Sequence, residues 1–253
     1  MNLAVATLSV ADETDETTIG VKIDSSTIDS SSRLRIVSSE LDTTYRALEL
    51  GGGFSELTIV GSHFHDHMGQ VIHSVTDLML ADQESLVVPT GETLTIVLNG
   101  NRTELTGGLV FEFWPEASSS AGNIDIQLRD NDFRYCQVDH LLEILDLGFF
   151  GNGGTASVLI ENNNFQGSAA DLVRIEPVSS FWDGSTDIFD NDVPDGNLSV
   201  IFRNNFMGQA ESNGIHIRNL STDAAGEAAF LIEDNDFDRV EDDVVRFSDR
   251  APD

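Results

Sequence analysis

The chain has 253 residues, enough for a substantial buried core in one or two domains, and 40% of them are hydrophobic, so it is a folded protein rather than a disordered acidic tail. Its 44 Asp and Glu residues against 13 Lys and Arg give a formal net charge of −31, which repels phosphate backbones and anionic lipids and excludes a general nucleic-acid binder. No apolar run approaches the ~20 residues that a membrane-spanning helix needs, so membrane insertion is not expected.

The N-terminal part, residues 1–33, contains short alternating apolar stretches but is too short for a full repeat unit and a cap. We expect it to form an N-terminal cap and a partial first coil, because solenoids need a cover over their open end. It lacks the basic n-region of a signal peptide. Together with the abrupt end at residues 250–253, this predicts an excerpt of a longer extracellular or cell-surface protein. A plain cytosolic protein is the alternative.

Lysine and cysteine are almost absent, since Lys22 and Cys136 are the only ones. A lone cysteine excludes an internal disulfide and any metal site built from several cysteines. An acidic, lysine-poor composition favours a saline or cation-rich environment in which bound cations screen the self-repulsion.

From residue 34 onward one motif recurs: an aliphatic residue, an Asn three positions later and an aromatic residue two positions after that. Weaker copies come first, with Ser in place of Asn or with the aromatic lost: Ile36-Ser39-Leu41, Ile59-Ser62-Phe64 and Ile96-Asn99-Asn101. Four clean copies follow: Leu128-Asn131-Phe133, Ile160-Asn163-Phe165, Ile201-Asn204-Phe206 and Ile232-Asn235-Phe237. A second short alternating run follows each copy, and the run at 141–145 also fits one face of a helix.

One unit of two or three short strands cannot bury its own apolar face, so successive units are expected to stack. Stacking produces parallel sheets in which equivalent residues form columns. We predict an all-β domain over 34–253, a single parallel β-helix of about seven coils with inserted loops. Its columns would be an inward aromatic stack and an Asn ladder at the turn, made by Phe64, Phe133, Phe165, Phe206 and Phe237 and by Asn99, Asn131, Asn163, Asn204 and Asn235.

Two other folds fit less well. A β-sandwich does not keep Asn at one offset through consecutive units, and a leucine-rich repeat needs a consensus that is absent here. Over residues 34–248 the Ile-x-x-Asn-x-Phe repeat resembles that of the right-handed, pectate-lyase-like parallel β-helix superfamily. The resemblance implies a right-handed solenoid. It leaves function open, because the superfamily includes polysaccharide lyases, glycoside hydrolases, uronate epimerases, tailspikes, adhesin passengers and stalks.

Alignment of the second runs places seven residues in one outward row: Glu49, His73, Glu112, Glu143, Arg174, His216 and Arg246. In a polysaccharide lyase or epimerase a cationic group neutralises the uronate and a base removes the C5 proton. Arg174, His216 and Arg246 are the candidates for these roles, and Glu143 would orient Arg174. The alternative is that opposite charges on adjacent coils simply pair. The polygalacturonase Arg-x-Lys segment cannot form, because the only lysine is Lys22.

Two segments have the composition of metal sites. His63, His65 and His67 alternate along one extended segment, which predicts a transition-metal site such as zinc, with a solvated His-rich turn as the alternative. Asp190, Asp192 and Asp195 precede Gly196 and resemble the Asp-rich calcium loops of thrombospondin type 3 repeats. Calcium is the cofactor that this loop predicts, and a solvated acidic loop is the alternative.

These observations favour a non-catalytic extracellular or cell-surface β-helix module, a structural or adhesive segment of a larger acidic protein. Its expected partners are a polysaccharide or a cell surface and further β-helix coils of a parent chain, with no nucleic acid. The alternative is a polysaccharide-active enzyme of the uronate lyase or epimerase class. A tailspike-like fibre component is the third reading.

Overall fold

The structure is a computed structural model that describes residues 2–3, 8–9, 19–23, 33–42, 46–50, 55–67, 71–74, 92–112, 123–136, 140–145, 155–176, 197–218 and 227–248. These ranges contain strands and turns and no helix, so the all-β prediction is confirmed for them. Within these ranges there is accordingly no helix that is long and apolar enough to span a membrane.

The strands form three sheets of eight, and within each sheet neighbouring strands pair in parallel. The first sheet contains β1 (Asn2–Leu3), β4 (Arg33–Val37), β7 (Glu56–Val60), β10 (Thr93–Asn99), β13 (Asn123–Arg129), β16 (Thr155–Glu161), β19 (Asn197–Arg203) and β22 (Ala228–Glu233). The second contains β2 (Leu8–Ser9), β5 (Glu40–Asp42), β8 (His63–His65), β11 (Arg102–Thr106), β14 (Asp132–Cys136), β17 (Asn164–Ser168), β20 (Phe206–Ala210) and β23 (Asp236–Val240). The third contains β3 (Ile19–Ile23), β6 (Arg46–Leu50), β9 (Ile72–Ser74), β12 (Leu109–Glu112), β15 (Leu142–Leu145), β18 (Val173–Glu176), β21 (Ile215–Arg218) and β24 (Val245–Ser248).

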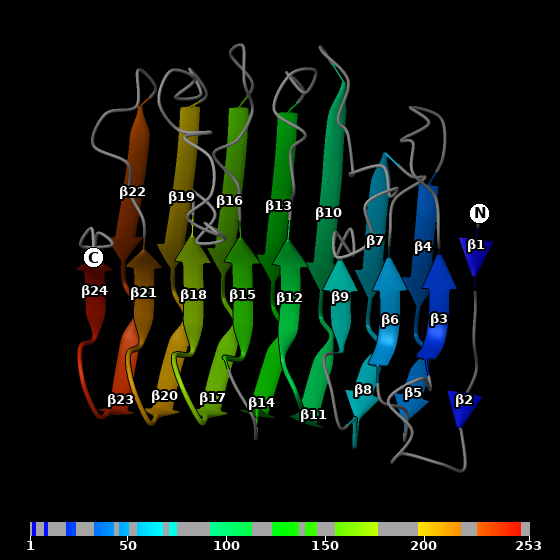
Figure 1. Ribbon diagram of the computed structural model, residues 1–253, viewed down its shortest axis with the longest axis horizontal. Helices are drawn as coiled ribbons and strands as arrows, with labels where there is room; N and C mark the ends of the chain where they lie inside the picture. The colour runs from blue at the N-terminus through cyan, green and yellow to red at the C-terminus, as the bar shows by residue number, and fades with distance from the viewer. Residues whose placement is uncertain are drawn as a thin grey trace, which may run out of the picture.

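The chain visits the first, second and third sheets in turn and then returns to the first, one strand further along. We call one such passage a coil. Figure 1 shows the coils following one another along the long axis, with β1 at one end and β24 at the other. This arrangement is compatible with a parallel β-helix. The described strands make seven coils from β4 onward and a first coil of β1, β2 and β3 within residues 1–33, each of which pairs with a strand of the next coil. The run at 141–145, which also fitted a helix, contains the strand β15.

The core is formed by the inward face of each sheet. In the first sheet Ile96, Ile126, Val158 and Val200 are in register and buried. In the second sheet the inward column runs Phe64, Thr103, Phe133, Phe165, Met207 and Phe237. The rings of Phe133 and Phe165 stack with their centroids 5.2 Å apart. Most of the predicted aromatic stack is therefore present.

Phe206 does not belong to that column, so its predicted place in the stack is wrong. It pairs with Asn164, and Met207 takes the inward position beside Phe165. The motif was aligned one residue early in this coil because two apolar residues, Ile201 and Phe202, are adjacent. Phe202 is the buried one, so every following position shifts by one.

A buried ladder of amide side chains lines the turn between the first and second sheets. Asn163 is typical: its Oδ1 accepts hydrogen bonds from the backbone N–H of Asn131 and from Asn131 Nδ2, both at 2.9 Å. Its own Nδ2 donates to the carbonyl of Leu128 at 2.9 Å and to Oδ1 of Asn205 at 3.1 Å. The same pattern joins the five members of the Asn ladder, Asn101, Asn131, Asn163, Asn205 and Asn235, and Ser62 and Ser39 continue it toward the N-terminus.

Two of the five predicted ladder positions are wrong. Asn99 ends β10 and Asn204 is an exposed turn residue, and the ladder positions in their coils belong to Asn101 and Asn205. The residue just before each ladder position has a left-handed backbone, with φ between 50° and 63°. Asn204 is one of these, with φ at 55°. Asn is suited to the left-handed position, because it tolerates that backbone conformation, and to the ladder position after it, because it supplies the amide. The motif alone therefore does not show which of two adjacent Asn residues is the ladder member.

Candidate functional site: a polar cluster on the third sheet

The row predicted on the third sheet keeps its strand register with one exception. Successive strands place Lys22, Glu49, His73, Val110, Glu143, Arg174, His216 and Arg246 at one register position. Glu112 is not in the row, contrary to expectation. It pairs with Leu145, and Val110 holds its place, because β12 enters the sheet two residues earlier than the alignment assumed. The four candidate catalytic residues therefore lie on consecutive strands.

Arg174 is held by carboxylates on its own strand and on the preceding coil. Its Nε donates to Oε1 of Glu176 at 2.6 Å, and its Nη1 donates to Oε1 of Glu143 at 3.2 Å. Glu176 is 2% exposed and also accepts from Arg218 Nη1 at 3.2 Å. The Arg174 guanidinium therefore has carboxylate partners on its own strand and on the preceding coil. Pairing of charges between coils, the alternative that the sequence left open, is found for Arg174 and Glu143.

His216 lies between an aspartate and a serine. Its Nδ1 is 2.9 Å from Oδ2 of Asp171, and its Nε2 is 2.8 Å from Oγ of Ser248. Asp171 is buried, and its Oδ1 accepts from the backbone N–H of Asn213 at 3.0 Å and from Asn213 Nδ2 at 2.7 Å. An ionised Asp171 fixes the proton of His216 on Nδ1, which leaves Nε2 to accept from the Ser248 hydroxyl. This is the order of groups that activates a serine nucleophile.

Sequence reasoning found His216 but missed both of its partners. Asp171 lies in the turn two residues before β18, and Ser248 is the last residue of β24, in register with Arg218. Ser248 follows Arg246 by two positions and so shares its face of the strand. That spacing is the signal that would have placed a hydroxyl one coil away from His216.

The pKa of Asp171 is lowered. Burial opposes ionisation of this carboxyl, but hydrogen bonds from Asn213 and His216 and the nearby His140 outweigh it. Because the folded-state pKa lies below the unfolded value of about 3.9, the unfolded chain binds more protons between the two. The stabilisation by Asp171 is therefore present above the unfolded pKa and is lost as the pH falls through the folded pKa.

We expect Asp171→Asn to lower the free energy of unfolding at pH 7 by about 1–3 kcal/mol, the usual loss when a buried charged acceptor is removed. The difference from wild type should shrink as the pH falls below the unfolded pKa of about 3.9, because the unfolded wild-type chain then binds a proton at this carboxyl more readily than the folded chain does. Urea unfolding at several pH values measures it. Asp234→Asn, at an exposed turn position, is the control and should show almost no difference. A loss that is the same at pH 7 and pH 3 would contradict the assignment.

A groove of about 580 Å³ lies where the second sheet turns toward the third. Its lining residues come from successive coils: Leu105, Tyr135, Cys136, Gly167, Ser168, Ala169, Gln209, Ala210, Glu211, Arg239 and Glu241. One residue of each coil, Leu105, Tyr135, Gly167, Gln209 and Arg239, has a left-handed backbone with φ between 54° and 80°. Leu105 and Tyr135 are each 40% exposed. Tyr135 covers Gly167 so closely that a Cβ there would lie 2.8 Å from the ring.

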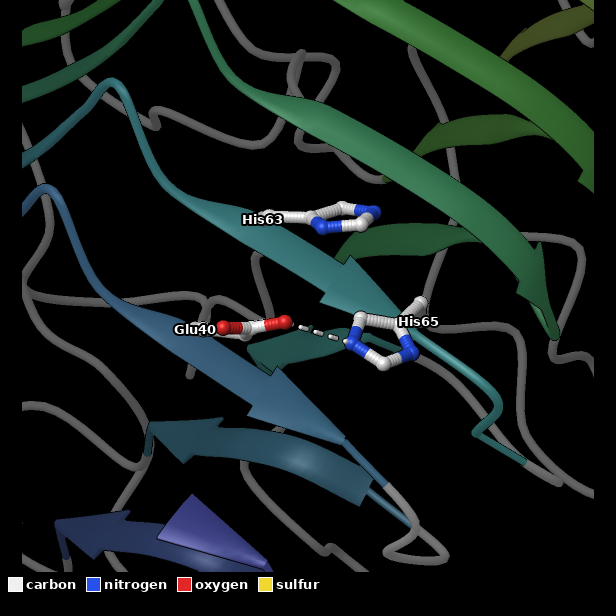
Figure 2. A group of neighbouring side chains, drawn as sticks. All are labelled: Glu40, His63 and His65. Atoms are coloured by element: carbon white, nitrogen blue, oxygen red, sulfur yellow. Dashed lines mark hydrogen bonds and ion pairs between the residues drawn. The ribbon is translucent and has the colours of Figure 1, made fainter. Parts of the chain in front are cut away.

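The histidines predicted as metal ligands separate into two environments. His63 and His65 lie on the outward face of β8 with Glu40 of β5 beside them, as Figure 2 shows. His67 is buried, and its Nε2 is 3.0 Å from the carbonyl oxygen of Leu41. Burial lowers the pKa of His63. The pKa of His65 is raised despite its burial, because Asp66 and Glu40 accept hydrogen bonds from its charged form. The predicted calcium ligands Asp190, Asp192 and Asp195 lie outside the described residues.

No family model, curated protein or solved structure matches this chain. The resemblance to the pectate-lyase-like superfamily therefore stays an inference from the repeat motif and from the compatible sheet order. The geometry of the groove and of the polar cluster carries the functional proposal.

Proposed function

We propose that this chain is a right-handed parallel β-helix module that binds an extended polysaccharide along the groove at the edge of its second sheet, as a non-catalytic structural or adhesive segment at a cell surface. The observation that carries the proposal is the groove itself. It crosses successive coils, as a linear polymer requires, and it offers an exposed tyrosine over a glycine. An amphipathic ring of this kind packs against a sugar face and still donates a hydrogen bond.

The charges in the groove favour a neutral glycan. Its charged lining residues are Glu211, Glu241 and Arg239, and the Arg239 Nε lies 2.9 Å from a carboxylate oxygen of Asp238. An anionic chain such as a polyuronate would meet this acidic lining and the negative field of the whole protein. The uronate lyase or epimerase alternative also needs Arg174 to face the substrate, and its ion pairs with Glu143 and Glu176 oppose that role.

The test is binding to a panel of neutral and uronate polysaccharides, measured by affinity electrophoresis and calorimetry. We expect wild type to bind a neutral polysaccharide. Tyr135→Ala should weaken that binding about tenfold, about 1.4 kcal/mol, because an aromatic anchor commonly dominates an interface. Leu231→Ala is the matched control, since it removes a large side chain of similar exposure, 45% against 40%, from the first sheet. Absence of wild-type binding across the panel, or equal loss in both variants, would refute the proposal.

One observation favours a second function, hydrolysis of an ester. The hydrogen-bonded order Ser248, His216, Asp171 would let Ser248 Oγ attack an acyl carbonyl while its proton passes to Nε2 of His216. His216 would return that proton to the leaving alcohol, and water would then release the acid. A fluorophosphonate probe separates the two functions in the same sample. Covalent labelling of Ser248 that is lost in His216→Ala supports the hydrolase. Absence of labelling in wild type would contradict it, and the hydrogen bonds among Ser248, His216 and Asp171 would then be structural only.

A further inference from the structure

We propose that Glu40, His63 and His65 form a three-ligand site for a divalent transition metal, with Zn²⁺ as the best-matched ion, on the outward face of the second sheet. The proposal is independent of the glycan-binding groove. It replaces His67, which the sequence suggested as the third ligand, by a carboxylate from the neighbouring coil.

The fold brings the three side chains together through strand register. His63 and His65 flank Phe64, whose side chain is buried, so both imidazoles project from the opposite, outward face of β8. On the adjacent strand β5, Glu40 is in register with His63. The ligand atoms of the three side chains all lie within 4.8 Å of one another. Figure 2 shows the two imidazoles and the carboxylate gathered on one side of the two strands.

His65 has a carboxylate at each ring nitrogen. Its Nδ1 is 2.8 Å from Oδ2 of Asp66, and its Nε2 is 3.2 Å from Oε1 of Glu40. A neutral imidazole has one N–H, so only one carboxylate can receive a proton from it. The charged imidazole donates to both carboxylates, and a metal ion at Nε2 would take the place of the proton that points to Glu40 while Nδ1–H stays on Asp66. A carboxylate on the far nitrogen is also the usual orienting partner of a metal-bound histidine.

Two buried polar atoms in this region have no hydrogen-bond partner. One is Nε2 of His63, and the other is Oδ1 of Asp42, which belongs to the residue in register with His65. Unsatisfied buried polar atoms are uncommon and unfavourable in proteins. Both belong to the proposed site's immediate surroundings, since His63 is one of the three clustered residues and Asp42 is in register with His65. The orphaned nitrogen is therefore an observation separate from the clustering of the three side chains.

The surrounding charge favours a cation. Glu40, Asp42, Asp66 and Glu104 contribute −4 and Arg102 contributes +1, so the local formal charge is −3. Arg102 lies in register with His63 on the other side, but its Nη2 donates to Oε2 of Glu104 at 2.6 Å, which offsets its charge. Two imidazoles and one carboxylate are the ligands of zinc and its neighbours rather than of calcium, and three protein ligands leave a fourth position open for water.

The test uses untagged protein stripped with a chelator and titrated with ZnCl₂ alone, at moderate salt and with excess Mg²⁺ to suppress loose binding to the acidic surface. Calorimetry and metal analysis after dialysis give affinity and stoichiometry. We expect one Zn²⁺ per chain in wild type. Glu40→Gln, His63→Ala and His65→Ala should each weaken binding by about tenfold or more. All three residues are on the outward face, and thermal unfolding verifies that each variant is folded.

Glu104→Gln is the matched control. It removes the same charge as Glu40→Gln, from the other strand beside β8, without removing a proposed ligand. We expect its zinc affinity to stay within about threefold of wild type. If Glu104→Gln and Glu40→Gln weakened zinc binding equally, the binding would come from the general negative charge and not from coordination by Glu40, and the proposal would be overturned. Absence of stoichiometric zinc in wild type, or full affinity in His63→Ala, would overturn it as well.

Discussion

Replacement of Asn163 by alanine is expected to lower the free energy of unfolding by about 3–5 kcal/mol. The side chain is 2% exposed and takes part in four hydrogen bonds that join three coils. Alanine would leave the backbone N–H of Asn131 and the carbonyl of Leu128 without these partners, with no access to water. Equilibrium unfolding in urea measures the loss.

The neighbouring residue supplies the control for this prediction. Asn162 is exposed, has φ at 56°, and donates only its backbone N–H, to the carbonyl of Arg203 at 3.2 Å. Glycine accepts that backbone conformation and keeps the N–H, so Asn162→Gly should change the free energy of unfolding by less than about 1 kcal/mol. Similar losses in the two variants would show that the turn, and not the Asn ladder, holds the coils together.

A methyl group at Gly108 is expected to prevent normal packing of β12, with a loss of more than about 4 kcal/mol or no soluble protein. Gly108 has φ at 102°, and a Cβ there would lie 2.2 Å from the carbonyl oxygen of His140. That oxygen is backbone of the next coil and cannot rotate away. On the other side, the carbonyl of Gly108 accepts a hydrogen bond from the Val71 N–H at 2.7 Å, so Gly108 contacts both neighbouring coils. Soluble yield and urea unfolding of Gly108→Ala measure the effect.

Gly100 lies in the same coil and separates the steric effect from the backbone effect. It also has a positive φ, 63°, but a Cβ there would meet nothing within 4 Å. Gly100→Ala should therefore lose only about 1–2 kcal/mol, the usual cost of a left-handed backbone for a residue other than glycine. If Gly108→Ala were no worse than Gly100→Ala, the close approach of the two coils at His140 would be refuted.

Much of the fold was predictable because a parallel stack repeats one environment in every coil. The spacing of aliphatic, Asn and aromatic residues predicted the inward column that contains Phe133 and Phe165, and the second runs predicted that Arg174 and His216 are neighbours. The errors have the same origin. Where two residues of the right type are adjacent, as with Asn204 and Asn205, the motif fits either one, and only packing decides which is buried.

The amino-acid sequence by itself determined the all-β class, the parallel repeat and the succession of Glu143, Arg174, His216 and Arg246, because these depend on local periodicity that recurs in each coil. Only the tertiary structure decided which side chains meet across coils. His216 lies 45 residues from Asp171 and 32 from Ser248, and His65 lies 25 residues from Glu40. Since the loops between strands vary in length, no fixed separation in sequence marks such neighbours. Contacts that depend on the register of stacked strands therefore become visible only when the coils are in place.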